Sequence, residues 1–213
     1  MPDSSTPPAH PEHAELLGDR YTESAFERSF YRRDLAVVPP FLASLVGDTL
    51  PAAVARPSTA EEVSAIVRYA AECRLPLTPR AAATTAYWNA VPMRGGLVLD
   101  LNGMRGLVRL DEATLRATVL PGTRWEELDR TLKRRGITLQ SYPTSAPAAT
   151  VGGWISMEGH GIGSLKYGGV AEQVTGLEVV LADGQIVDVP GRDVPGTSSR
   201  PVTGRPLMGR SWR

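Results

Sequence analysis

The chain has 213 residues, of which 42% are hydrophobic and 22% charged, and its 23 basic and 23 acidic residues give a net charge of zero. This length suits one large or two small domains with a buried core, and the balanced charge gives no support to a nucleic-acid partner. Cys73 is the only cysteine, which excludes an internal disulfide and cysteine-rich metal sites and favours a cytoplasmic location.

The N-terminal part of the chain carries no sign of a targeting segment. Residues 1–13 lack the basic start and apolar core of a signal peptide, and no apolar run approaches the roughly 18 residues that span a membrane. Residues 1–18 lack periodicity, which predicts a flexible tail. Apolar spacing predicts a helix over residues 21–31, and residues 34–40 should be extended. We therefore assign residues 1–49 to an N-terminal tail and entry helix.

The pattern that follows alternates between strand and helix. Residues 50–55 predict a short strand. A helix should begin just after it, because either Ser58 with Glu61 or Thr59 with Glu62 can form a capping box.

Apolar residues on one face predict that this helix extends to about residue 73. We then expect a short strand at residues 75–78, a loop at residues 79–92 and a buried strand at residues 96–101. Residues 107–110 and 114–119 predict a strand pair.

A second helix is predicted over residues 123–135, with Thr123 as its cap and Glu126 three residues later. A strand at residues 174–181 and a hairpin turn at residues 182–184 complete an α+β domain.

We expect this domain to have two lobes, residues 50–120 and 121–189, with a ligand between them. Residues 190–213 are rich in Pro, Gly, Arg and Ser and predict a disordered tail.

Residues 145–168 form the stretch in which small residues are densest. They hold six glycines, which lose more backbone freedom on folding than any other residue. Two interpretations are open: the backbone wraps a ligand, or the loop only packs tightly against a sheet. The glycines are Gly152, Gly153, Gly159, Gly161, Gly163 and Gly168.

Three blocks in order carry a resemblance to a known family. PLTPRAAATTAYWNAVP resembles the phosphate-binding loop of the vanillyl-alcohol oxidase and p-cresol methylhydroxylase flavoproteins, and ATVGGWISMEGHGIGSLKYG is similar to their second flavin-contacting segment. VTGLEVVLADGQIV is similar to the strand and hairpin that follow. The resemblance covers roughly residues 34–189 and implies a two-lobed FAD-binding domain of the p-cresol methylhydroxylase type, with an incomplete second lobe.

The resemblance implies a pyrophosphate site in the first of these segments. Backbone amides beside tiny side chains form an anion nest, and the residues implied are Arg80, Ala81, Ala82, Ala83, Thr84, Thr85 and Ala86.

The family usually has glycines where this chain has the three alanines of that loop. If those positions need left-handed backbone, binding is weakened; if they are helix-like, alanine is harmless. The loop holds neither His nor Cys, so FAD should bind noncovalently.

The second segment is implied to contact the flavin and its phosphates, with the amides of a short helix at residues 150–153 facing the phosphates. The residues implied are Thr144, Ser145, Thr150, Val151, Gly152, Gly153, Gly159, Gly161 and Ile162. No metal ligand and no catalytic residue is assigned.

The chain is also similar to glycolate and D-lactate dehydrogenase-type members, and the resemblance implies an FAD-linked oxidoreductase that takes a hydride from an alcohol or hydroxy acid. The family normally continues into further strands and a substrate domain, so we expect a truncated member. The alternative is a non-catalytic remnant without tight flavin binding, or a scaffold subunit completed by a second chain.

Overall fold

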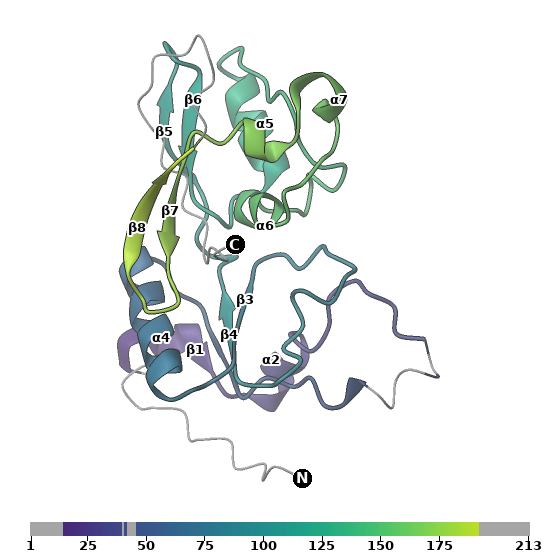
Figure 1. The fold of residues 1–213 in the computed structure, drawn as a ribbon, viewed down its shortest axis with the longest axis vertical. Helices are drawn as coiled ribbons and strands as arrows, with labels where there is room; N and C mark the ends of the chain where they lie inside the picture. The colour runs from purple at the N-terminus through teal and green to yellow at the C-terminus, as the bar shows by residue number, and fades with distance from the viewer. Residues whose placement is uncertain (1–14, 40, 42–45, 192–213) are drawn as a thin grey trace.

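The computed structural model describes residues 15–39, 41 and 46–191. They form an α+β fold in which strands and helices gather into two bodies joined by a long hairpin (Figure 1). Residues 192–213 of the expected C-terminal tail and most of the tail at residues 1–18 lie outside the described residues, whereas residue 190, where that tail is expected to begin, ends the last strand. Within the N-terminal tail, Leu17 is only 2% exposed and packs in the first core, so the folded part begins earlier than the sequence predicts.

The first body is built on a four-stranded sheet with the order β1-β2-β4-β3. β1 (Tyr21–Thr22) pairs antiparallel with β2 (Ala53–Ala55), while β2 and β3 (Leu77–Arg80) both run parallel to the central β4 (Leu97–Asp100). Parallel strands end at one edge of a sheet, so the chain leaves β3 and β4 side by side. The register pairs the last residues of these two strands with each other.

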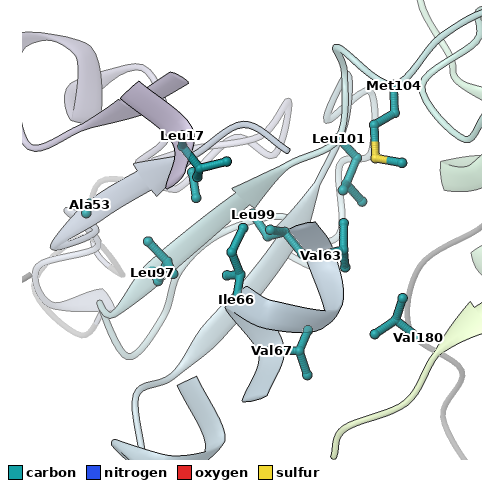
Figure 2. Close-up of a cluster of buried hydrophobic side chains, with 11 residues drawn as sticks. Leu17, Ala53, Val63, Ile66, Val67, Leu97, Leu99, Leu101, Met104 and Val180 are labelled. Atoms are coloured by element: carbon teal, nitrogen blue, oxygen red, sulfur yellow. The ribbon is translucent and has the colours of Figure 1, made fainter. Parts of the chain in front are cut away.

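Helix α4 (Ala60–Glu72) covers this sheet. Val63 and Ile66 are fully buried and belong to the same cluster as Leu97 and Leu99 of the central strand, and Figure 2 shows Ile66 beside these two leucines. The helix ends in a Schellman turn, with Arg74 left-handed at a φ of 53° and the Leu75 amide donating to the Ala70 carbonyl. This turn uses residues that the sequence assigns to the next strand, so β3 begins at residue 77 and not at residue 75.

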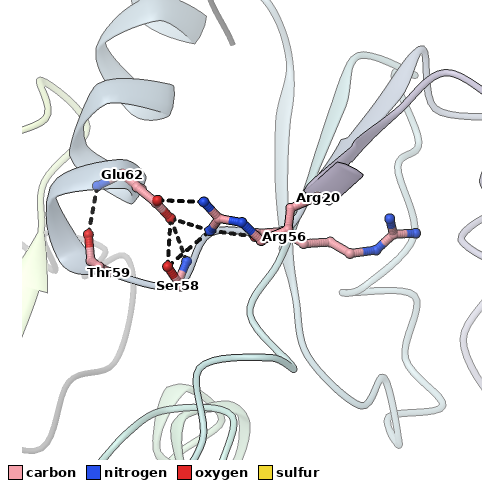
Figure 3. Close-up of polar contacts among 5 residues, drawn as sticks. All are labelled: Arg20, Arg56, Ser58, Thr59 and Glu62. Carbon is pink, nitrogen blue, oxygen red and sulfur yellow. Dashed lines mark hydrogen bonds and ion pairs between the residues drawn. The ribbon is translucent and has the colours of Figure 1, made fainter. Parts of the chain in front are cut away.

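The start of α4 is fixed by a polar cluster (Figure 3). Thr59 is the N-cap, and its hydroxyl accepts the Glu62 amide, as one of the two predicted boxes requires. The Glu62 carboxylate, however, accepts the Ser58 amide at 2.6 Å and both Arg20 Nη atoms at 2.6 and 2.7 Å. The Arg20 guanidinium is the largest cause that lowers the pKa of Glu62 to about 2.

We predict that Glu62→Gln lowers the free energy of unfolding at neutral pH by about 1–2 kcal/mol, because it removes the charge that pairs with Arg20. The loss is no larger because the Arg20 side chain is 36% exposed and solvent screens the pair. The folded pKa lies below the ordinary value of 4.5. The stabilisation is therefore fully present above about pH 4.5 and is lost as the pH falls toward 2. Urea unfolding between pH 7 and pH 3.5 measures it.

Glu72→Gln, at the other end of α4, is the control. Glu72 is exposed, so its replacement should change the free energy of unfolding at neutral pH by less than about 0.5 kcal/mol. A Glu62→Gln protein with the wild-type stability curve across this range would contradict the assignment.

The second body contains the hairpin β5 (Leu107–Asp111) and β6 (Arg116–Val119) and helix α5 (Trp125–Lys133). Their apolar residues form a second buried cluster around Trp125, Leu128 and Leu132. The two clusters divide the chain between Met104 and Leu107, ahead of residue 121, where the sequence places the lobe boundary.

The predicted cap of α5 is wrong. Arg124 occupies the N-cap position and makes no side-chain cap hydrogen bond. Thr123 is only 2% exposed, and its hydroxyl accepts the Gly106 amide at 2.9 Å. This threonine therefore ties α5 to the start of the hairpin.

Three short helices complete the second body: α6 (Val151–Ser156), α7 (Ser164–Tyr167) and the 3₁₀ turn η3 (Val170–Glu172). The chain then returns to the first body through the hairpin β7 (Gly176–Val180) and β8 (Ile186–Pro190).

The tip of this hairpin packs on α4. Val180 belongs to the first core, and the Ser64 hydroxyl donates to the Gly184 carbonyl at 2.5 Å. Gly184 has a φ of 82°, as the predicted turn requires.

The N-terminal helix is shorter than predicted. η1 (Gly18–Arg20) and β1 precede α2 (Ala25–Ser29). Residues 21 and 22 pair with β2 as a strand, so tertiary pairing overrides their helical spacing.

Candidate functional site

The expected phosphate loop leaves the C-terminal end of β3. Among the described residues, the six consecutive backbone amides from residue 81 to residue 86 donate no hydrogen bond. The side chains there are partly exposed or exposed. Buried or half-buried backbone donors normally have partners, and consecutive unpaired amides form a concavity that binds anions. The residues concerned are Ala81, Ala82, Ala83, Thr84, Thr85 and Ala86.

The conformation of this loop answers the question left open by its alanines. Ala83 has a φ of 50° and Trp88 a φ of 65°, whereas Ala81 and Ala82 do not have positive φ. Left-handed backbone is costly for residues with a Cβ. One of the three alanines is therefore strained, and the other two are tolerated.

We predict that Ala83→Gly increases the free energy of unfolding by about 0.5–1 kcal/mol, because it relieves left-handed backbone strain. Ala82→Gly is the matched control. It should lower stability by about 0.4–1 kcal/mol, since it only adds freedom to the unfolded chain. Denaturant unfolding of both variants compares them directly, and equal effects would show that the loop carries no strain at residue 83.

The Arg80 guanidinium contacts backbone carbonyls of the N-terminal segment and of the loop itself. Its Nη1 donates to the carbonyls of Tyr31 at 3.2 Å and Ala90 at 3.1 Å, and its Nη2 donates to that of Phe30 at 3.4 Å. Burial lowers the pKa of Arg80, although Asp100 and other neighbours oppose the shift. The side chain expected to hold phosphate is therefore engaged with backbone carbonyls.

Most of the expected glycines in the second segment are required by packing within the protein. A Cβ on Gly152 would lie 2.7 Å from the Pro121 side chain, and one on Gly159 would lie 2.0 Å from the Trp154 ring. A Cβ on Gly161 would lie 2.3 Å from the Tyr142 carbonyl oxygen. For these positions the tight-packing interpretation accounts for the glycine without a ligand.

The predicted short helix is present as α6, with Thr150 at its N-cap and only 3% exposed. Two of its first amides are already engaged, because Val151 donates to the Thr123 carbonyl and Gly152 to the Pro121 carbonyl, each at 2.8 Å. These two amides therefore hold α6 in place instead of facing a phosphate.

Gly153 is the exception among the glycines of α6. It is exposed, and an added Cβ would meet only the Thr150 hydroxyl, at 2.9 Å. Met157 lies four residues later on the same helical face. Its sulfur is 2.7 Å from Asn89 Nδ2 of the first loop, so this face of α6 is turned toward that loop.

The remaining expected residues of the second body lie on its surface. Thr144 and Ser145 are exposed, and their hydroxyls form no hydrogen bond with the described residues. Ile162 is 48% exposed and forms a β-bridge with Tyr142. The sequence missed Asn89 and Met157, because a contact between residues 68 positions apart leaves no local pattern.

The chain matches the FAD binding domain family over residues 51–190. It belongs to this family. A glycolate oxidase subunit, GlcD, from Bacillus subtilis (strain 168) is 36% identical over 144 residues, which are 68% of this chain and 31% of that protein. The D-lactate dehydrogenase of Archaeoglobus fulgidus is 36% identical over 154 residues, which are 72% of this chain and 34% of that protein. The chain thus spans about a third of the length of these relatives.

Solved structures show the same fold. p-Cresol methylhydroxylase with substrate bound superposes with a TM-score of 0.74 and 22% identity over 94% of this chain and 38% of its own. Alkyldihydroxyacetonephosphate synthase gives 0.73 and 20% identity over 86% of this chain and 38% of its own. At these identities the likeness shows the fold alone, and that fold is the predicted FAD-binding type.

The cofactor of this family, FAD, fits the loop geometry. Its pyrophosphate needs donors that approach oxygen closely. The amides of residues 81–86, which donate no hydrogen bond to the described residues, are donors of this kind.

A cavity of about 150 Å³ lies elsewhere in the described part of the chain. Its lining includes Arg33, Asp34, Thr49 and Trp88 but no residue of the second segment, so it is not the space between the two loops. No helix in the described ranges is long and apolar enough to cross a membrane.

Proposed function

We propose that this chain binds FAD noncovalently between the loop at residues 81–86 and the face of α6 that carries Gly153, as the cofactor-binding part of an oxidoreductase. The observation that carries the proposal is the run of six unpaired amides at the end of β3. The contact between Asn89 and Met157 supports it, because it joins the two segments that the cofactor would bridge.

The loop would hold the pyrophosphate through backbone amides, helped by the hydroxyls of Thr84 and Thr85. Thr85 already accepts the Tyr87 amide at 3.3 Å and donates to Asn89 at 2.6 Å, so its side chain shapes the loop and its amide remains for phosphate. From the second body, Thr144 and Ser145 would offer exposed hydroxyls. A noncovalent mode follows from the absence of His and Cys in this loop.

Bound FAD would supply the electron acceptor, taking a hydride at N5 from the C–H bond of an alcohol or hydroxy acid. The printed names of the relatives, glycolate oxidase and D-lactate dehydrogenase, support that substrate class. We assign no substrate-binding residue or general base to the described residues. Those groups would come from a substrate domain, in the same polypeptide or in a second chain. A cytoplasmic location stays a prediction from the single cysteine.

The first test is titration of the purified chain with FAD, followed by quenching of flavin fluorescence. We expect saturable binding in a folded protein. A folded chain that shows no saturable binding would favour the alternative, a non-catalytic remnant of the family.

Substitutions of increasing side-chain size at Gly153 test whether the cofactor lies against this face of α6. Gly153→Ala and Gly153→Val add the same Cβ against the Thr150 hydroxyl, but only valine extends a branched side chain toward the first loop. We predict that alanine changes the Kd for FAD less than threefold and that valine raises it at least tenfold, which is about 1.4 kcal/mol. Equal affinities for the two variants would place the cofactor away from this face of α6.

A further inference from the structure

The segment that precedes the matched domain is attached to the phosphate loop at several points. The family match begins at residue 51, yet residues 20–35 reach the loop through both side chains and backbone. The Leu35 amide donates to the Thr85 carbonyl at 2.9 Å, in the middle of the loop. We refer to residues 20–35 as the N-terminal brace.

Arg80 joins the brace to both ends of the loop. It is the last residue of β3, and its guanidinium donates to the carbonyls of Phe30 and Tyr31 in the brace and to that of Ala90 at the far end of the loop. The guanidinium carbon also lies 5.3 Å from the centre of the Tyr31 ring, a cation–π contact. One side chain thereby fixes where the loop starts and where it returns.

Tyr31 is itself held by the central strand. Its hydroxyl donates to Asp100 Oδ2 at 2.7 Å, at the end of β4. Asp100 is 9% exposed and is the register partner of Arg80. The other carboxylate oxygen of Asp100 accepts the Asn102 amide at 2.9 Å. The Tyr31 ring, which contacts the Arg80 guanidinium, is thus positioned by the sheet from which the loop leaves.

The brace is also fixed to the first body away from the loop. Arg20 pairs with Glu62 at 2.6 Å and Glu27 with Arg56 at 2.7 Å. Arg28 Nη1 donates to the Pro51 carbonyl at 2.8 Å. Together with the pairing of β1 and β2, these contacts make the brace a firm support for the loop.

We propose that the N-terminal brace, acting through Tyr31 and Arg80, is a positioning element of the FAD site that holds the amides of residues 81–86 in their binding arrangement. The proposal rests on the proposed FAD site. Arg80 acts here by positioning the loop backbone, because its guanidinium donates to the carbonyls of Phe30 and Tyr31 in the brace and to that of Ala90 in the loop. A lysine cannot replace it, since an ammonium lacks the planar fork that reaches three carbonyls.

The test uses Tyr31→Phe and Arg80→Lys, with Tyr21→Phe as a matched control. Tyr21 also lies in the brace and donates to a carboxylate, that of Glu23 at 3.1 Å, but it contacts neither end of the loop. We expect Tyr31→Phe and Arg80→Lys to raise the Kd for FAD at least fivefold, and Tyr21→Phe less than twofold. The melting temperature without FAD is measured alongside, so that a general loss of stability is recognised.

A readout without FAD separates this proposal from the one on which it rests. Amide hydrogen exchange of Leu35 and Leu101, which donate to the Thr85 and Arg80 carbonyls, should be faster in Tyr31→Phe and Arg80→Lys but not in Tyr21→Phe. If the wild type binds no FAD, the proposed function fails while this exchange result still supports the brace.

Three outcomes would contradict the proposal that the brace positions the loop. One is wild-type affinity and exchange in both variants. Another is a loss of affinity that Tyr21→Phe shares. The third is wild-type affinity in Arg80→Lys together with a large loss in Arg80→Met, which would make Arg80 a direct phosphate contact.

Discussion

The burial of β4 is the constraint on which the rest of the site depends. All four residues of this strand are buried, and parallel partners flank it on both sides. α4 covers it with Val63 and Ile66, which are 0% exposed. Because the strands are parallel, β3 and β4 end together, and Arg80 lies beside Asp100. A loop that leaves this edge emerges beside the second body, where a ligand can bridge the two.

Local patterns allowed much of this fold to be predicted. α4, the strand pair at β5 and β6, and the hairpin turn before β8 follow from capping, apolar spacing and turn residues within a few positions of one another. The elements that were misplaced depend on distant partners. β1 is a strand only because β2 pairs with it, and Thr123 forms no cap because Gly106 holds its hydroxyl.

The candidate site shows a similar division. The resemblance indicated both segments of the candidate site, but glycine content alone could not separate backbone that approaches a ligand from backbone that packs closely against the protein. Gly152 and Gly161 belong to the second kind, since Pro121 and Tyr142 fill the space of a side chain. The contact between Arg80 and Tyr31 could not be predicted either, because the two residues lie 49 positions apart in the sequence and no spacing rule connects them.

The strain at Ala83 and the attachment of the loop at Arg80 are physically connected. A residue with a Cβ keeps a left-handed conformation only where its surroundings over-determine it. Here the loop is fixed at residue 80, at residue 90 and, through the Leu35 amide, at Thr85, so residues 81–86 have few other paths to follow. The conformational entropy of these amides is therefore lost when the protein folds, so the binding energy of a ligand does not have to offset it. Attachment at its ends can thus hold this loop of alanines in a path that glycines would follow with less strain.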